Sequence, residues 1–160
     1  LPCWTMTAVN GPAYGGGCEI MLAFDFCIAS PKATFGFTQG KFYLPPGWGG
    51  LTRLVEAVGR STALQWLAEA KIIDACTALD NKLINKVATE ESLKNETWQW
   101  AKQLSKNDRR FIQNLKQGAM RVGQARWDAI EAELESFAEF WESDLHEERV
   151  ETFLNRKNNT

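Results

Sequence analysis

The sequence comprises 160 residues, of which 44% are hydrophobic and 24% charged, and its formal net charge is −2. This length and composition predict one domain with a substantial hydrophobic core. The weakly acidic balance provides no general attraction to nucleic acid, which proteins typically bind through a basic face. No apolar run reaches the roughly 18 residues that a membrane-spanning helix needs. We therefore expect neither a nucleic acid nor a membrane as a partner.

The four cysteines and the single histidine limit the chemistry that the chain can support. Cys3, Cys18, Cys27 and Cys76 form no C-x-x-C pair, so their spacing predicts no metal site. Scattered single thiols favour a reducing compartment, the cytoplasm or an organelle matrix, and each is expected to be a small core residue. His146 lies in a charged stretch and is expected at the surface. Without a second histidine, Ser-His or Cys-His catalysis has little support.

Short β-rich runs alternate with glycine-rich loops up to about residue 88. The residues around Asn10-Gly11-Pro12 and Ser30-Pro31-Lys32 predict turns, and residues 45–50 predict a rigid loop. Ser61 and Asp74 are expected to cap two helices at their N-termini. The pattern predicts strands at 5–10, 26–29, 34–37 and 83–87, and helices at 18–24, 51–58, 61–70 and directly after residue 74.

Helical periodicity dominates from Ser92 onward, with a break at Asn107-Asp108 and a last helix capped by Ser143 that extends to about residue 157. One helix carries an apolar stripe at intervals of 3, 4, 3 and 4, formed by Trp127, Ile130, Leu134, Phe137 and Trp141. Its other faces carry Glu131, Glu133, Glu135 and Glu139. The stripe either packs on its own domain or forms a subunit interface, and the sequence leaves both interpretations open.

Residues 8–19 form the segment that is most informative about chemistry. Gly15, Gly16 and Gly17 open a predicted helix, where glycine lets the backbone approach a ligand closely. The free N–H groups of a first helical turn suit an anion or a developing oxyanion. Glu19 lies close enough to move a proton on a group that these amides hold. A glutamate in a first turn is also favoured by the helix dipole alone, so a purely structural interpretation stays open.

The same segment closely resembles the signature of the crotonase (enoyl-CoA hydratase/isomerase) superfamily. The likeness continues in register at residues 25–26, 29–36, 46–50, 53–54, 58–60, 63–64, 73–75 and 153–157. It implies an α/β fold, the ββα spiral of that family, incomplete at its N-terminus. Residues 1–88 would form the C-terminal part of the spiral core, and residues 89–160 a helical region that trimerises, often as a dimer of trimers.

The resemblance also implies an acyl-CoA thioester as substrate, with coenzyme A as part of that substrate and no tightly bound cofactor. Two backbone amides would hold the thioester oxygen. Gly16 matches the second amide, and the first would lie ahead of Leu1 in a segment needed to complete the site. Glu19 matches the first of two family glutamates, whereas Gln39 stands in place of the second. Glutamine cannot accept a proton as a carboxylate does, so a reaction with one acid/base is expected.

Further substrate-binding positions follow from the resemblance: Tyr14, Gly15, Gly17, Tyr43, Pro46, Trp48 and Arg156. Tyr43 and Lys82 stand where the family usually has glycine. Tyr43 either lines the acyl pocket or serves packing. Arg156 matches a basic residue that reaches a neighbouring subunit's CoA phosphates in relatives, and a plain surface charge is the alternative.

Three functions are consistent with these residues. The first is an enoyl-CoA hydratase/isomerase-like enzyme that stabilises a thioester enolate and uses Glu19 as acid/base. The second is a decarboxylase of ethylmalonyl-CoA or methylmalonyl-CoA type, which the stretches 48–50 and 53–56 resemble. The third is a non-catalytic crotonase-like subunit, which Gln39 and the incomplete N-terminal part of the fold favour.

Overall fold

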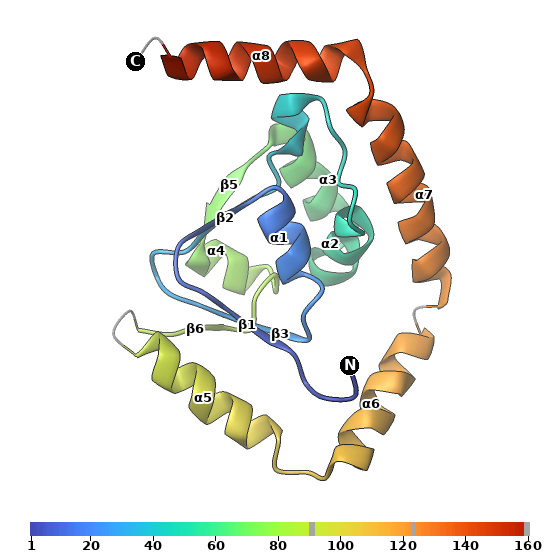
Figure 1. Cartoon of the computed structure of the whole chain (residues 1–160). Coiled ribbons are helices and arrows are strands. Elements are labelled where there is room, and N and C mark those ends of the chain that lie inside the picture. Colours follow the sequence, from blue (N-terminus) through green and yellow to red (C-terminus); the bar gives the residue numbers. More distant parts are fainter. Residues whose placement is uncertain (90–91, 123, 159–160) are drawn as a thin grey trace.

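The computed structural model describes residues 1–89, 92–122 and 124–158. Short strands and helices form a core, and four longer helices run around it in one continuous path (Figure 1). The core strands are β1 (Met6–Val9), β2 (Pro12–Tyr14), β3 (Phe26–Ala29), β4 (Thr34–Gly36), β5 (Ile72–Asp74) and β6 (Lys86–Val87). The core helices are α1 (Gly16–Met21), the 3-10 helix η1 (Gln39–Phe42), α2 (Gly50–Val58), α3 (Arg60–Glu69) and α4 (Ala75–Asp80). The surrounding arm comprises α5 (Leu93–Leu104), α6 (Arg109–Val122), α7 (Gln124–Trp141) and α8 (Asp144–Asn158).

The strands form two small sheets, in the orders β1-β3-β6 and β2-β4-β5. β1 pairs parallel with β3 and β2 pairs parallel with β4, so each consecutive pair of strands adds one strand to each sheet. A helix then follows each pair, α1 after the first and, beyond η1, α2 after the second. This repeated β-β-helix path agrees with the spiral that the sequence resemblance implies.

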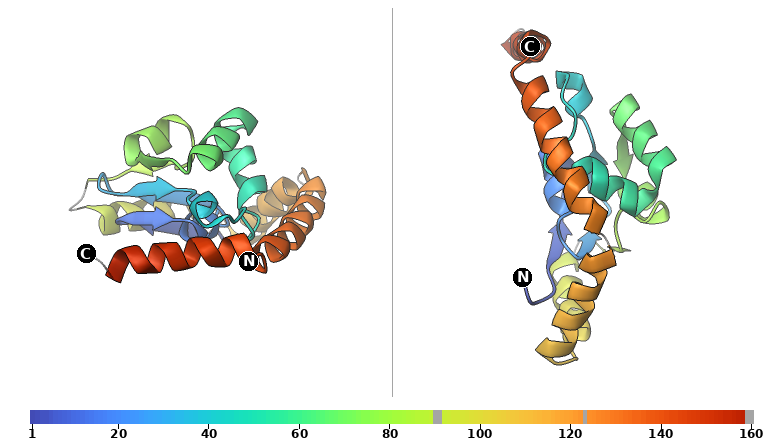
Figure 2. Two further views of the ribbon diagram at one scale, coloured as in Figure 1. Left: turned by 90° about the horizontal axis from the view of Figure 1, so that it is seen from above. Right: turned by 90° about the vertical axis from the view of Figure 1, so that its right-hand side faces the viewer.

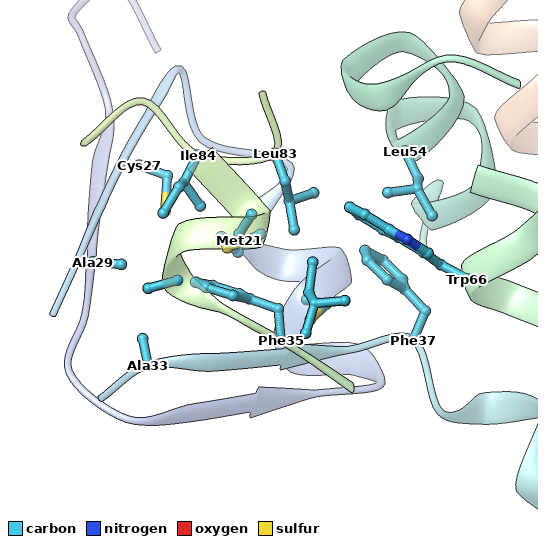
Figure 3. Close-up of a cluster of buried hydrophobic side chains, with 14 of the residues drawn as sticks. Met21, Cys27, Ala29, Ala33, Phe35, Phe37, Leu54, Trp66, Leu83 and Ile84 are labelled. Carbon is cyan, nitrogen blue, oxygen red and sulfur yellow. The ribbon is translucent and has the colours of Figure 1, made fainter. Parts of the chain in front are cut away.

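The hydrophobic core lies between the sheets and the short helices. Phe35 lies in β4 and Phe37 directly after it, and both side chains are fully buried. Figure 3 shows them beside Met21, Leu54 and Trp66, which come from α1, α2 and α3. Burying each such side chain stabilises the fold by about 1.5–3 kcal/mol, so this cluster fixes α1 and α2 against the sheets.

Several predicted elements are confirmed and others are wrong. The side chain of Asp74 caps α4 by accepting a hydrogen bond from the Thr77 amide at 2.7 Å, as expected. Ser61 does not cap α3, which begins one residue earlier behind Gly59. The chain bends at Gly11, within the turn expected at residues 10–12, but Pro12 already begins β2. β2, β5 and η1 were not predicted. These elements have only three or four residues.

The cysteine and histidine predictions are partly wrong. Cys18 and Cys27 are buried as expected, but Cys3 and Cys76 are exposed, because the first precedes β1 and the second lies on the outer face of α4. His146 is not at the surface: only 8% of it is exposed. Its ring lies 5.0 Å from that of Trp141, and its Nδ1 lies 2.7 Å from the carbonyl oxygen of Phe42. The histidine therefore joins α8 to η1.

The arm is attached to the core along its length. The Lys116 ammonium on α6 lies 2.7 Å from the carboxylate of Asp25, and the Trp4 indole donates to the Leu104 carbonyl at 3.1 Å. α7 contacts α2, which Figure 2 shows lying behind it in the right-hand view, and α8 contacts η1. The predicted cap of α8 is confirmed, since Ser143 Oγ accepts a hydrogen bond from the His146 amide at 3.3 Å. The division of the chain into units 1–88 and 89–160 stays a prediction.

The apolar stripe of α7 divides between two environments. Ile130 and Phe137 face the core, where they pack against Gly49 and Gly47. Trp127, Leu134 and Trp141 are exposed. The packing interpretation is therefore confirmed for Ile130 and Phe137, whereas the subunit interface stays a prediction for the three exposed residues.

None of the helices in the described ranges has the length and apolar character needed to cross a membrane. Within the same ranges, no group of three or more His, Cys, Asp or Glu side chains is arranged to hold a metal ion.

Candidate active site

The N-terminus of α1 offers two unused hydrogen-bond donors. Gly15 has φ 52°, a left-handed conformation that favours glycine, and its amide donates to the Gly36 carbonyl at 2.8 Å. This bond ties the turn before α1 to the end of β4. The amides of Gly16 and Gly17 then have no acceptor among the described residues, as expected for a first helical turn. They are the donors that the sequence singled out for an oxyanion.

The indole of Trp48 covers the backbone of Gly16. A Cβ atom placed on Gly16 would lie 2.7 Å from Cζ3 of that ring, closer than real side chains approach each other. Trp48 as a whole is 55% exposed, so its ring covers Gly16 although the residue lies at the surface. Gly16 and Trp48, expected at the same site, are therefore neighbours in space although they come from α1 and from the loop before α2.

Glu19 is 3% exposed, and both of its carboxylate oxygens are hydrogen-bonded. Oε1 accepts from Nε2 of Gln39 at 2.7 Å, while Oε2 accepts from the amides of Gly47 at 3.1 Å and Trp48 at 2.8 Å. Three donors thus face the carboxylate. A Cβ atom on Gly50 would lie 2.5 Å from Oε2, so the backbone of α2 also closes on this group. Glu19 is held in one orientation.

Gln39 contributes the second half of this pair. It begins η1, only 7% of it is exposed, and its Nε2 is the atom that faces Glu19. Its Oε1 has no hydrogen-bond partner and is the only such buried side-chain atom within the described ranges. Because buried acceptors are nearly always paired, this oxygen suits a donor supplied from outside, such as a water or a hydroxyl group.

Cys18, next to Glu19 in α1, is not a second reactive group. Burial, with a smaller contribution from the Glu19 charge, raises the pKa of its thiol to about 12. Its Sγ donates to the Ala13 carbonyl at 2.9 Å. Since the thiolate is the nucleophilic form of cysteine, this side chain fills space and supports α1.

Two hollows in the described part of the chain are not lined by Glu19 or Gln39. The larger, of about 900 Å³, lies between the N-terminal segment and α6, and Trp4, Phe24 and Met120 are among its lining residues. The smaller, of about 330 Å³, lies between Pro45-Pro46 and α7. Of the expected substrate-binding residues whose side chains the structure describes, Pro46 alone lines one of these two hollows. The site is therefore recognised by its backbone donors and its side-chain pair.

The backbone conformation at Tyr43 and Lys82 explains why glycine was expected at both positions. Both adopt left-handed backbone conformations, with φ 56° and φ 63°, which glycine accepts without strain. The ring of Tyr43 lies 5.1 Å from that of Phe140 on α7, an arrangement that favours the packing interpretation. Tyr14 lies on β2, where its hydroxyl is 2.9 Å from Oγ1 of Thr34. The side chain of Arg156 lies outside the described part of the chain.

Sequence reasoning missed two groups that support this site. Glu133 was assigned to an outer face of its helix, yet it is buried against the start of α2. His146 was assigned to the surface, yet it contacts η1. The position of Glu133 between Ile130 and Phe137 at helical spacing was a usable signal, because residues at i, i+3 and i+7 share a face.

Comparison with known proteins settles the family. The family model for enoyl-CoA hydratase/isomerase matches residues 1–160. The chain belongs to the enoyl-CoA hydratase/isomerase family. Among solved structures, it is similar to carnitinyl-CoA hydratase from Mycobacterium avium, with 30% identity and a TM-score of 0.91 over 98% of this chain and 61% of that one.

Two other members of the family show the same similarity. Enoyl-CoA hydratase/isomerase from Pseudoalteromonas atlantica T6c is 28% identical, with a TM-score of 0.88 over 93% of this chain and 60% of its own. Enoyl-CoA hydratase from Bacillus halodurans is 25% identical, with a TM-score of 0.87 over 94% of this chain and 61% of its own. The chain thus has the α/β crotonase fold and spans about three fifths of the length of these relatives.

Proposed function

We propose that this chain carries the proton-transfer part of an acyl-CoA site, in which the Gly16 amide stabilises a thioester oxyanion and Glu19 acts as acid/base. The observation that carries the proposal is the free Gly16 amide in the same helical turn as a buried, oriented carboxylate. Donors aimed at a developing oxyanion commonly contribute about 2.7–4 kcal/mol each to transition-state stabilisation. The substrate would be an enoyl-CoA thioester, with coenzyme A entering as part of it.

The lone pairs of Glu19 suggest how it would act. Oε2 already accepts two backbone hydrogen bonds, whereas Oε1 accepts only one, from Gln39. The remaining lone pair of Oε1 would take a proton from the substrate α-carbon or from a water, as the carbonyl becomes an enolate held by Gly16. In an isomerisation, Glu19 returns the proton taken from the α-carbon to a different carbon. In a hydration, the water's oxygen adds at the β-carbon while its proton passes to Glu19, and Glu19 then delivers that proton to the α-carbon of the enolate.

Gln39 would orient rather than transfer protons. Its unpartnered Oε1 suits the O–H of a water or of a hydroxyacyl product. The amide has no acid/base function of its own, so one carboxylate has to serve both proton transfers. This arrangement favours isomerisation, or a hydration in which Glu19 works alone.

Decarboxylation is the second candidate, because Gln39 is neutral. A substrate carboxylate that departs as CO₂ would meet no like charge from Gln39, and Glu19 could then protonate the enolate carbon. Ethylmalonyl-CoA and methylmalonyl-CoA are the substrates that separate this reaction from hydration and isomerisation.

The experiment is an assay of crotonyl-CoA, a 3-enoyl-CoA and ethylmalonyl-CoA with wild type and Glu19→Gln. Because the chain spans about 60% of its relatives' length, both this chain and the longest chain that its gene encodes are tested. Turnover of one thioester that the substitution abolishes supports the proposal. Binding without turnover of any of them, by either form, would favour a non-catalytic subunit and contradict it.

We further propose that the uncovered stripe of α7, formed by Trp127, Leu134 and Trp141, is an interface between copies of this chain, in a trimer or a dimer of trimers. Three large apolar side chains repeat there at intervals of seven residues and are all exposed. Sedimentation equilibrium of wild type and Leu134→Glu tests this, since a charge at the centre of the stripe should yield monomers. A monomeric wild type would refute it.

A further inference from the structure

The N-terminus of α2 is capped by a carboxylate from the distant helix α7. Gly49, which precedes α2, has no side chain to cap it. Glu133 supplies the missing acceptors: its Oε2 accepts from the Leu51 amide at 3.2 Å, and its Oε1 accepts from the Thr52 amide at 2.6 Å and from the Thr52 hydroxyl. Glu133 is 8% exposed, whereas Glu131 and Glu135 on the same helix are exposed. Its burial therefore reflects this contact.

The same short segment is held from its other side by Glu19. Residues 47–52 present four bonded amides in sequence, of which the first two donate to Glu19 and the last two to Glu133. Gly50 lies between these two pairs, and its backbone packs directly against the Glu19 carboxylate. The loop that carries Trp48 is thus clamped between two carboxylates.

Phe137 adds a second contact between α7 and this segment. Its ring packs directly on Gly47, whose amide is one of the two that hold Glu19. A shift of α7 would therefore reach Gly47 through packing and residues 51–52 through the Glu133 hydrogen bonds. Both routes end within a few residues of an amide that orients Glu19.

We propose that Glu133 is a positioning residue of the candidate active site. By fixing residues 51 and 52, it holds the preceding loop so that the amides of Gly47 and Trp48 orient Glu19 and the indole covers Gly16. The catalytic consequence rests on the proposed function, whereas the structural link between Glu133 and the loop does not. In this arrangement the C-terminal arm sets the geometry of a site that is otherwise built by the core.

Three variants separate positioning from general stability. Glu133→Ala removes both acceptors. Glu133→Gln keeps an oxygen for Thr52 but turns an NH₂ group toward the Leu51 amide, so its effect should be intermediate. Glu135→Ala removes the same charge from an exposed position of the same helix and serves as the matched control.

The first readout is amide hydrogen exchange measured residue by residue by NMR, at a temperature where all variants are folded. In Glu133→Ala, exchange of the Gly47 and Trp48 amides should accelerate at least tenfold, together with that of Leu51 and Thr52. In Glu135→Ala these four rates should stay within twofold of wild type. If only Leu51 and Thr52 respond in Glu133→Ala, the carboxylate is a local helix cap and the proposal is wrong.

The second readout is steady-state kinetics with the thioester that wild type turns over best. Loss of orientation of Glu19 should lower kcat at least tenfold in Glu133→Ala, with KM within threefold, and Glu133→Gln should recover part of kcat. An unchanged kcat in a variant whose loop amides exchange faster would overturn the catalytic part of the proposal. If wild type turns over no thioester, the proposed function fails, while the exchange measurement still decides whether Glu133 positions the loop.

Discussion

Replacing Glu19 by glutamine should remove proton transfer while leaving the fold intact. The substituted side chain has the same size, and its carbonyl oxygen can take the place of Oε2 and accept from the amides of Gly47 and Trp48. Its NH₂ group then faces Gln39, whose amide rotates by about 180° so that the unpartnered Oε1 accepts from it. The number of buried hydrogen bonds is thereby preserved.

The expected loss of stability follows from these contacts. Three bonds to a charged acceptor, at roughly 1.5–3 kcal/mol each, become neutral bonds of about 0.5–1.5 kcal/mol. Part of this difference is offset, because a buried carboxylate no longer has to be desolvated. We expect Glu19→Gln to lower the free energy of unfolding by about 1–2 kcal/mol. Glu19→Ala leaves three buried donors without a partner, at about 1–3 kcal/mol each, and should cost at least about 3 kcal/mol.

Urea denaturation of wild type, Glu19→Gln and Glu19→Ala measures these differences, and thioester turnover measures the catalytic effect. General acid/base catalysis typically contributes about 10²–10⁴-fold, so kcat should fall by that factor in Glu19→Gln. Turnover of the glutamine variant at the wild-type rate would remove Glu19 from the mechanism. Equal destabilisation of the two variants would refute the rotation of Gln39.

Three further predictions concern stability. Lys82→Gly should raise the free energy of unfolding by up to about 1 kcal/mol, because glycine accepts the left-handed backbone conformation without strain. Lys71→Gly, the control, should lower the free energy of unfolding. Equal effects of the two substitutions in urea denaturation would contradict this. Burial raises the pKa of both Cys18 and Cys27 from 9.0 to about 12, so their contribution to stability is complete below pH 9 and is lost as the pH rises toward 12. Replacing both by alanine should flatten that alkaline decline. Burial alone would raise the pKa of the Asp25 carboxyl, but its hydrogen bonds outweigh this and lower the pKa below 3.8. The stability that the ionised carboxylate contributes is therefore present at neutral pH and is lost below about pH 4. An Asp25→Asn variant with the wild-type acid midpoint would exclude that contribution.

The parts of the fold that were predictable are those with a clear period or a specific turn. The residues of β3, α2 and α8 follow patterns long or regular enough to be recognised, and Asp74 and Ser143 cap the helices that they precede. β2, β5 and η1 were missed, although the recognised strands β3 and β4 are equally short, so length alone does not explain the difference. Their place is decided by pairing and packing with elements that lie far away in the chain.

The sequence by itself determined the family signature, the glycine turn before α1 and the candidate pair Glu19 and Gln39. These are local features, since a glycine-rich turn and a first helical turn follow from neighbouring residues. Tertiary structure alone decided that amides of the loop before α2 bind Glu19. It also decided that Glu133 is buried against the start of α2 and that His146 is buried against η1. Hydrogen bonds between residues 81 to 104 positions apart depend on how α7 and α8 pack against the core, and no local pattern records that packing.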